Sequence, residues 1–304
     1  MNKISRDTSI MIRGVAALLV IIAHYSQWYA TATDAGIVCM LLTKLGRYGV
    51  SIFFAVSGYG LLCSAERGID RDFLKRRVLS VYLPYVLIFG IINFLEEGSW
   101  KIKDIILWLC GLKAWFIFVI MLFYFIFYFG YKYCKHKMLS IVIGVFTVSS
   151  LLSYCTKDDV WYASNISFVV GMFIKLYEDK IAEFSKFIFI GISMGGFIGS
   201  ALIYMMAMNQ NQIIYILFKI LASALWATLI LGILIQYKIG KVQCLKVIGS
   251  VSLECYLLHG FILRLFKPLS LQPIFLCGIS VMVTLVCAYV VHNVITKIIK
   301  LIRV

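Results

Sequence analysis

The 304-residue sequence has little charge, little proline and no paired cysteine motif. Asp, Glu, Lys and Arg make up 14% of the residues, whereas soluble domains carry about 25%. The nine cysteines include no Cys-x-x-Cys spacing, which argues against a zinc site and a disulfide framework, and we expect no bound metal. These absences exclude an ordinary soluble domain.

The sequence is instead rich in hydrophobic residues. They make up 62% of the chain, whose mean hydropathy is +0.95. They occur in blocks of about twenty residues, long enough to cross a hydrocarbon core of about 30 Å as helices. A transmembrane β-barrel would instead alternate apolar and polar residues in short segments. The sequence therefore predicts an all-α, polytopic membrane bundle in a single domain, 1–304.

Ten membrane spans are predicted from these apolar blocks, and the first has no signal-peptidase site after it, so we expect it to be retained. The segment 102–112 is too short to cross and is predicted to be interfacial or re-entrant. Gly191, Gly195 and Gly199 recur every four residues and predict a close-packing helix face. The predicted spans are 9–29, 46–64, 78–95, 113–131, 138–155, 161–178, 187–207, 213–235, 247–266 and 274–296.

The surplus of basic residues predicts the orientation of the chain. The net charge is +15, yet no separate basic domain is present that would bind nucleic acid. With the N-terminus in the cytoplasm, 18 Lys and Arg lie in inner segments and 5 in outer segments. Because Lys and Arg concentrate in cytoplasmic loops, both termini are predicted to be cytoplasmic.

The first span contains two residues whose burial in hydrocarbon is energetically costly, Arg13 and His24. Their spacing of eleven residues is close to three helical turns, so they share one face about 16 Å apart along the axis. A guanidinium suits phosphate or carboxylate, and an imidazole suits proton abstraction near neutral pH. The alternative is structural, with Arg13 extending to the interface and His24 bonded to a neighbouring helix.

Further polar residues occur at both ends of the second span and in the loop after it. Arg47 begins this span, and Ser57 and Tyr59 lie near its end. Lys75, Arg76 and Arg77 cluster where the third helix begins, a position that favours anions. Topology alone explains the charge of this cluster but not its concentration at one helix start.

The ninth span adds a carboxylate and a second histidine. Glu254, Tyr256 and His259 lie within "SVSLECYLLHG". Ionisable residues inside a membrane usually face a bundle interior or cavity. Together with Arg47, Ser57 and Tyr59, these three residues are candidates for a polar cavity.

Four stretches, in order, resemble the acyltransferase 3 family of integral-membrane acyltransferases. They are "RGVAALLVIIAH", "GVSIFFAVSGY", "FLKRRVLSVYLPY" and "IGSVSLECYLLHG". The first matches the family's signature of an arginine and a histidine separated by ten residues. The four stretches span nearly the whole chain.

The resemblance implies transfer of an acyl group, usually acetyl from acetyl-CoA, to a hydroxyl of a polysaccharide or lipid-linked sugar outside the cytoplasmic membrane of a bacterium. His24 would be the catalytic base and Arg13 its essential companion. Lys75, Arg76 and Arg77 would hold the donor, which is a substrate, and no permanent cofactor is expected. Many members append a soluble hydrolase-like domain that the sequence lacks, which leaves open a separate periplasmic or extracellular partner.

A secondary transporter or flippase is the alternative interpretation, because His24, Glu254 and Arg264 would also suit a proton relay. Against it, the spans show no inverted repeat and no matched pair of broken helices. The sequence has only three prolines, Pro84, Pro268 and Pro273, and at most one lies inside a predicted span.

Overall fold

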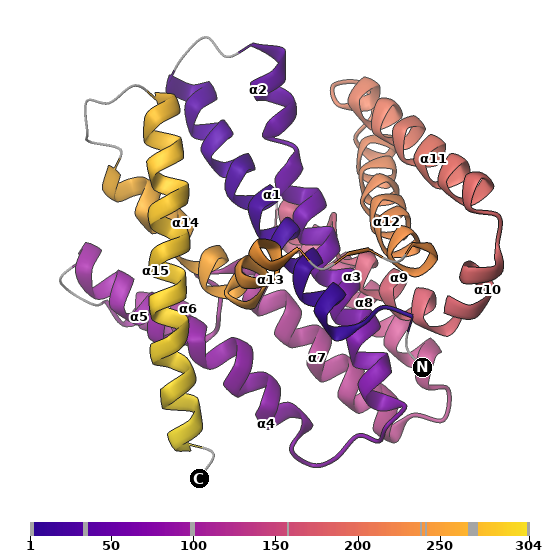
Figure 1. Cartoon of the computed structure of the whole chain (residues 1–304), viewed down its shortest axis with the longest axis horizontal. Helices are drawn as coiled ribbons and strands as arrows, with labels where there is room; N and C mark the ends of the chain where they lie inside the picture. The colour runs from indigo at the N-terminus through magenta and orange to yellow at the C-terminus, as the bar shows by residue number, and fades with distance from the viewer. Residues whose placement is uncertain are drawn as a thin grey trace.

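The computed structural model describes residues 3–32, 36–97, 101–156, 158–237, 239–240, 242–266 and 273–302. These residues fold into helices joined by short turns, without a strand among them (Figure 1). The predicted class, a polytopic all-α bundle, is confirmed.

The helices follow one another as α1 (Arg6–Ala32), α2 (Ile37–Leu42), α3 (Leu45–Ala65), α4 (Phe73–Arg77), the π-helical turn η1 (Val78–Tyr82), α5 (Leu83–Glu97), α6 (Ile102–Leu109), α7 (Trp115–Tyr133), α8 (Lys137–Cys155), the 3-10 turn η2 (Asp159–Trp161), α9 (Ile166–Leu176), α10 (Glu178–Glu183), α11 (Lys186–Ala207), α12 (Gln212–Gln236), α13 (Gln243–Ser250), α14 (Ser252–Phe266) and α15 (Pro273–Ile302).

Eight helices among the described residues are long and apolar enough to cross a membrane, or nine if the bent pair α13–α14 forms one span. This pair bends by 73° within the predicted span 247–266. The predicted span 161–178 corresponds to α9, whose 11 residues rise only about 16 Å. The segment predicted not to cross contains α6, a helix of eight residues.

The centre of the bundle is α3, which packs against α1, α9 and α12 (Figure 1). Glycine permits the close approach of α3 and α9. A Cβ on Gly171 would lie 1.9 Å from the carbonyl oxygen of Ala55, and one on Gly58 would lie 2.0 Å from that of Phe168. Gly58 belongs to the "SGY" phrase of the second predicted span, so this glycine brings α9 against α3.

The predicted close-packing face on α11 is wrong within this chain. A Cβ added at Gly191, Gly195 or Gly199 would meet no atom within 4 Å. The buried side of α11 instead includes Ser193 and Ser200, and α11 pairs with α12 at one edge of the bundle (Figure 1). Four-residue spacing identifies a smooth helix face but not which face is buried.

Candidate active site

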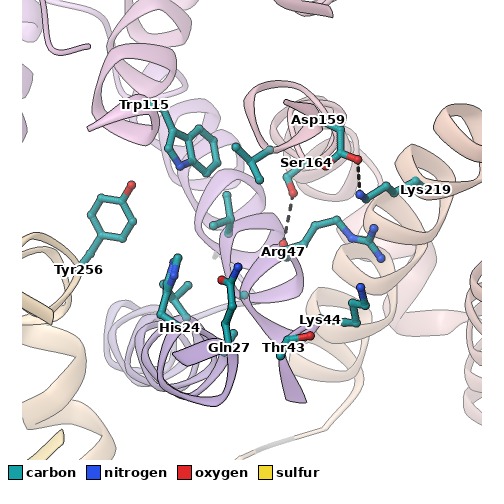
Figure 2. A pocket seen from close by; sticks show the side chains of 15 residues that line it. His24, Gln27, Thr43, Lys44, Arg47, Trp115, Asp159, Ser164, Lys219 and Tyr256 are labelled. Atoms are coloured by element: carbon teal, nitrogen blue, oxygen red, sulfur yellow. Dashed lines mark hydrogen bonds and ion pairs between the residues drawn. The ribbon is translucent and has the colours of Figure 1, made fainter. Parts of the chain in front are cut away.

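A cavity of about 200 Å³ lies among α1, α3, α7, α12 and α14, near the end of α1 (Figure 2). His24 and Tyr256 lie on one side of it, and Arg47 and Lys219 on the other. The helices meet here because α1 packs on both α3 and α14. The lining residues are Val20, Ala23, His24, Gln27, Thr43, Lys44, Gly46, Arg47, Val50, Trp115, Asp159, Val160, Ser164, Lys219 and Tyr256.

The rotation of α1 that presents His24 to the cavity is fixed by the next residue, Tyr25. The buried Tyr25 hydroxyl lies 2.9 Å from the Thr284 hydroxyl and 3.3 Å from the carbonyl oxygens of His259 and Ser280. These contacts tie α1 to α14 and α15. The side chain of His24 therefore faces the cavity and is accessible from it.

His259 lies directly beside His24. Their ring centres are 4.9 Å apart, and the His259 ring is buried. Its Nδ1 lies 2.6 Å from the carbonyl oxygen of Tyr256. Because a carbonyl oxygen only accepts, Nδ1 carries the proton in this bond, which leaves Nε2 as the acceptor of a neutral ring. The predicted candidates His259 and Tyr256 therefore accompany His24.

The opposite wall of the cavity is basic. Lys44 immediately precedes α3, Arg47 lies in the first turn of α3, and Lys219 comes from α12. The Lys219 ammonium is paired with Asp159 and donates to the Tyr215 hydroxyl at 2.7 Å. The Arg47 backbone oxygen accepts from Ser164, which anchors the start of α3 to the turn before α9 (Figure 2).

A second group of cations lies nearer the beginning of α1. The Arg13 guanidinium lies within electrostatic range of Tyr124, Arg6 and Arg77. The guanidinium carbon of Arg77 lies 5.4 Å from the ring centre of Tyr124. Within the described part of the chain, neither Arg13 nor Arg77 has a carboxylate partner. We call Arg6, Arg13 and Arg77 the inner cation cluster.

The other two residues of the predicted basic cluster lie outside this group. Arg76 donates hydrogen bonds of 2.7 and 2.8 Å to the Asp70 carboxylate, and these bonds lower the pKa of that carboxyl. Lys75 is exposed to solvent. Of the three, Arg77 is the one that reaches Tyr124 and Arg13.

Three predicted cavity candidates lie away from His24. The Tyr59 hydroxyl donates to Glu178 at 2.5 Å, in a buried group near the beginning of the chain. Glu254 is buried and its Oε1 lies 2.8 Å from Nδ1 of His292 on α15. Ser57 is half-buried on α3. None of these three lines the cavity.

Several residues that line the cavity were not among the predicted candidates. Lys219 is a lone lysine within the apolar run "YILFKILAS", and the same kind of signal identified Arg13. Asp159, Lys44 and Gln27 carried no sequence signal, because polar residues near helix ends are ordinary. His292 was likewise missed as the partner of Glu254.

The membrane-length apolar helices among the described residues, packed around a cavity with polar lining, define a multi-pass membrane protein. The acyltransferase domain model of the acyltransferase 3 family matches residues 9–292, and the chain belongs to this family. It is therefore a membrane acyltransferase. No curated protein and no solved structure matches the chain.

Proposed function

We propose that the protein transfers an acetyl group from cytoplasmic acetyl-CoA to a hydroxyl of a polysaccharide or lipid-linked sugar outside the membrane. The observation that carries this proposal is the placement of His24. It faces a cavity beside His259 and Tyr256, on the same helix that carries Arg13 into the inner cation cluster. One helix thus carries a base for a hydroxyl and a cation for phosphates.

The proposal assigns the donor to the inner cation cluster. Acetyl-CoA carries several phosphate charges on a nucleotide and its thioester at the end of a thin arm. Arg13, Arg77 and Arg6 are positioned to neutralise phosphates, because among the described residues no carboxylate neutralises Arg13 or Arg77. Lys75 and Arg76 would serve as outlying contacts. Both α1 and α7 run from this cluster to the cavity, so the arm would follow them towards His24.

His24 would act as the general base. Its ring nitrogen accepts the proton of the acceptor hydroxyl while the hydroxyl oxygen attacks the thioester carbonyl carbon. Collapse of the tetrahedral intermediate breaks the carbon–sulfur bond, and the departing CoA sulfur receives the proton from His24. The Gln27 amide and the Tyr256 hydroxyl line the same cavity on the side of His24, and either could donate a hydrogen bond to the oxyanion.

The location follows from the charge distribution. With both termini predicted to be cytoplasmic, the inner cation cluster would lie on the donor side, and the cavity would lie in the outer half of the membrane. We place the protein in a bacterial cytoplasmic membrane, where acetyl-CoA is made on one side and surface glycans are assembled on the other. A partner outside the membrane would then present or receive the glycan.

The test uses the full chain in lipid vesicles with labelled acetyl-CoA and candidate glycan acceptors, read by mass spectrometry of the product. His24→Ala is expected to lower the rate about 10²–10⁴-fold, the usual effect of removing a positioned acid–base group. Acetyl-CoA binding should be retained. His136→Ala, at an exposed histidine before α8, is the matched control and should be fully active. Substantial acetylated product from His24→Ala would contradict the assigned role.

A further inference from the structure

The basic wall of the cavity is not needed for proton abstraction, and only one of its three cations has a carboxylate partner among the described residues. The charged residues lining the cavity are Lys44, Arg47, Lys219 and Asp159, three cations and one carboxylate. Placing cations near a membrane interior is costly unless they pair with anions. The single carboxylate is already occupied by Lys219 and by the hydroxyl of Tyr215, which donates to it at 3.0 Å.

Arg47 is the residue with the least compensation. Its guanidinium carbon lies 4.7 Å from the ring centre of Tyr48 and 4.6 Å from that of Tyr204, and one terminal nitrogen donates to the Tyr48 hydroxyl at 2.8 Å. Its Nε atom is buried without a hydrogen-bond partner. Within the described ranges no carboxylate pairs with it.

A guanidinium held between two aromatic rings is already ordered, so it has little conformational freedom left to lose when a ligand binds. Its remaining fork suits the two oxygens of a carboxylate or phosphate. Lys44, three residues earlier, also lines the cavity, and its ammonium group makes no hydrogen bond or ion pair in the described part of the chain. The wall therefore offers two uncompensated cations opposite the base (Figure 2).

From this geometry we infer that the cavity selects an acceptor sugar bearing an anionic group, a carboxylate or a phosphate, beside the hydroxyl that is acylated. The inference rests on the proposed function and adds the charge of the acceptor. The anion binds Arg47 and Lys44, and the hydroxyl lies at His24 across the cavity. Both groups belong to one ligand, because the cavity of about 200 Å³ holds roughly one sugar residue.

The experiment measures binding to the full chain in lipid nanodiscs by ligand-observed NMR, without any requirement for turnover. The probes are glucuronate, glucose 1-phosphate and glucose. The two anionic sugars are expected to bind at least tenfold more tightly than glucose. Comparing the two shows whether a carboxylate or a phosphate is preferred.

Arg47→Gln and Lys44→Gln should each reduce the advantage of the anionic sugars over glucose in binding affinity. Arg47→Lys should retain part of this advantage. Lys103→Gln removes an exposed lysine on α6, outside the cavity, and should leave the advantage intact. Equal binding of the three sugars to the unmodified protein would overturn the inference. So would an unchanged advantage in Arg47→Gln.

Acetyl-CoA binding to the same samples separates the two proposals. It should be unchanged in Arg47→Gln, and its loss would show that the basic wall holds donor phosphates, which also overturns the inference. If anionic sugars bind preferentially but the unmodified protein acetylates none of them, the anion site stands and the proposed transfer to sugars fails.

Discussion

At the scale of single residues, the chemistry proposed for His24 requires a neutral imidazole whose lone pair meets the acceptor hydroxyl. The residue beside it, His259, has its Nδ1 held by the Tyr256 carbonyl oxygen, so the orientation of its ring is fixed. A fixed ring in contact with His24 limits the positions that the His24 ring adopts. We therefore propose that His259 is a positioning residue rather than a second base.

Replacing His259 tests this role. His259→Asn retains a donor near the Tyr256 carbonyl oxygen but removes the ring that contacts His24. We expect a loss of rate smaller than that of His24→Ala, with the acid limb of the pH–rate profile displaced. That limb exists because activity falls as the pH drops through the pKa of the base and the imidazole is protonated. A purely structural role would lower the amount of folded protein and leave the pH profile of the remainder unchanged.

The inner cation cluster predicts unequal effects at two adjacent arginines. Arg77 lies in the cluster without a carboxylate partner in the described residues, whereas Arg76 is paired with Asp70 and exposed. Arg77→Gln should therefore weaken acetyl-CoA binding about tenfold or more, the effect of losing one charged hydrogen bond, and Arg76→Gln much less. The difference should shrink in high salt.

Binding isotherms at low and high salt measure this difference, with the exposed Arg71→Gln as the control for net charge. An equal or larger effect at Arg76 would mean that the ion pair with Asp70 opens and that Arg76 holds the donor. The sequence alone could not separate the two residues, because neighbours on a helix point about 100° apart and the phase of α4 was unknown.

At the scale of elements, apolar runs predicted where helices lie but not where they bend. The third predicted span contains the π-helical turn Val78–Tyr82, which precedes Pro84. Proline has no N–H and its ring crowds the carbonyl four residues earlier, and a widened turn relieves both effects. The break at Val251 follows Gly249, whose missing Cβ would lie 1.8 Å from the carbonyl oxygen of Ile10. Such contacts come from other helices and are invisible to hydropathy.

Glycines that look alike in the sequence should respond differently to substitution. Gly171→Ala inserts a Cβ where Ala55 approaches to 1.9 Å, so α3 and α9 must separate. Overpacking of this kind costs about 1–3 kcal/mol. Gly195→Ala, on an open face of α11, should be neutral or stabilising by about 1 kcal/mol, because alanine favours helix.

Thermal unfolding of both variants in detergent, followed by helical circular dichroism, measures the contrast. A higher melting temperature for Gly171→Ala than for Gly195→Ala would show that α3 and α9 are not in close contact. His24 lies on α1, which packs against α3, and Arg47 lies within α3. Because Gly171→Ala displaces α3, it should also lower activity in the protein that remains folded.

At the scale of the whole molecule, the proposed function requires the donor site and the cavity to face opposite sides of the membrane. The chain separates them along α1, with Arg13 and His24 about 16 Å apart. The asymmetry of Lys and Arg predicts which side is cytoplasmic. This topology stays a prediction that charge counts alone can make, whereas the composition of the cavity depends on which helices meet.

Three exposed native cysteines provide a test of that topology. With a cytoplasmic N-terminus, Cys155 is predicted to lie on the outer side of the membrane, and Cys134 and Cys244 on the cytoplasmic side. A membrane-impermeant maleimide applied to intact cells should label Cys155 and neither of the other two, as read by peptide mass spectrometry. Permeabilised cells should show labelling of all three, which controls for thiol reactivity. Labelling of Cys134 and Cys244 in intact cells would invert the topology, place the His24 cavity on the cytoplasmic side, and remove the basis for transfer to a glycan outside the cell.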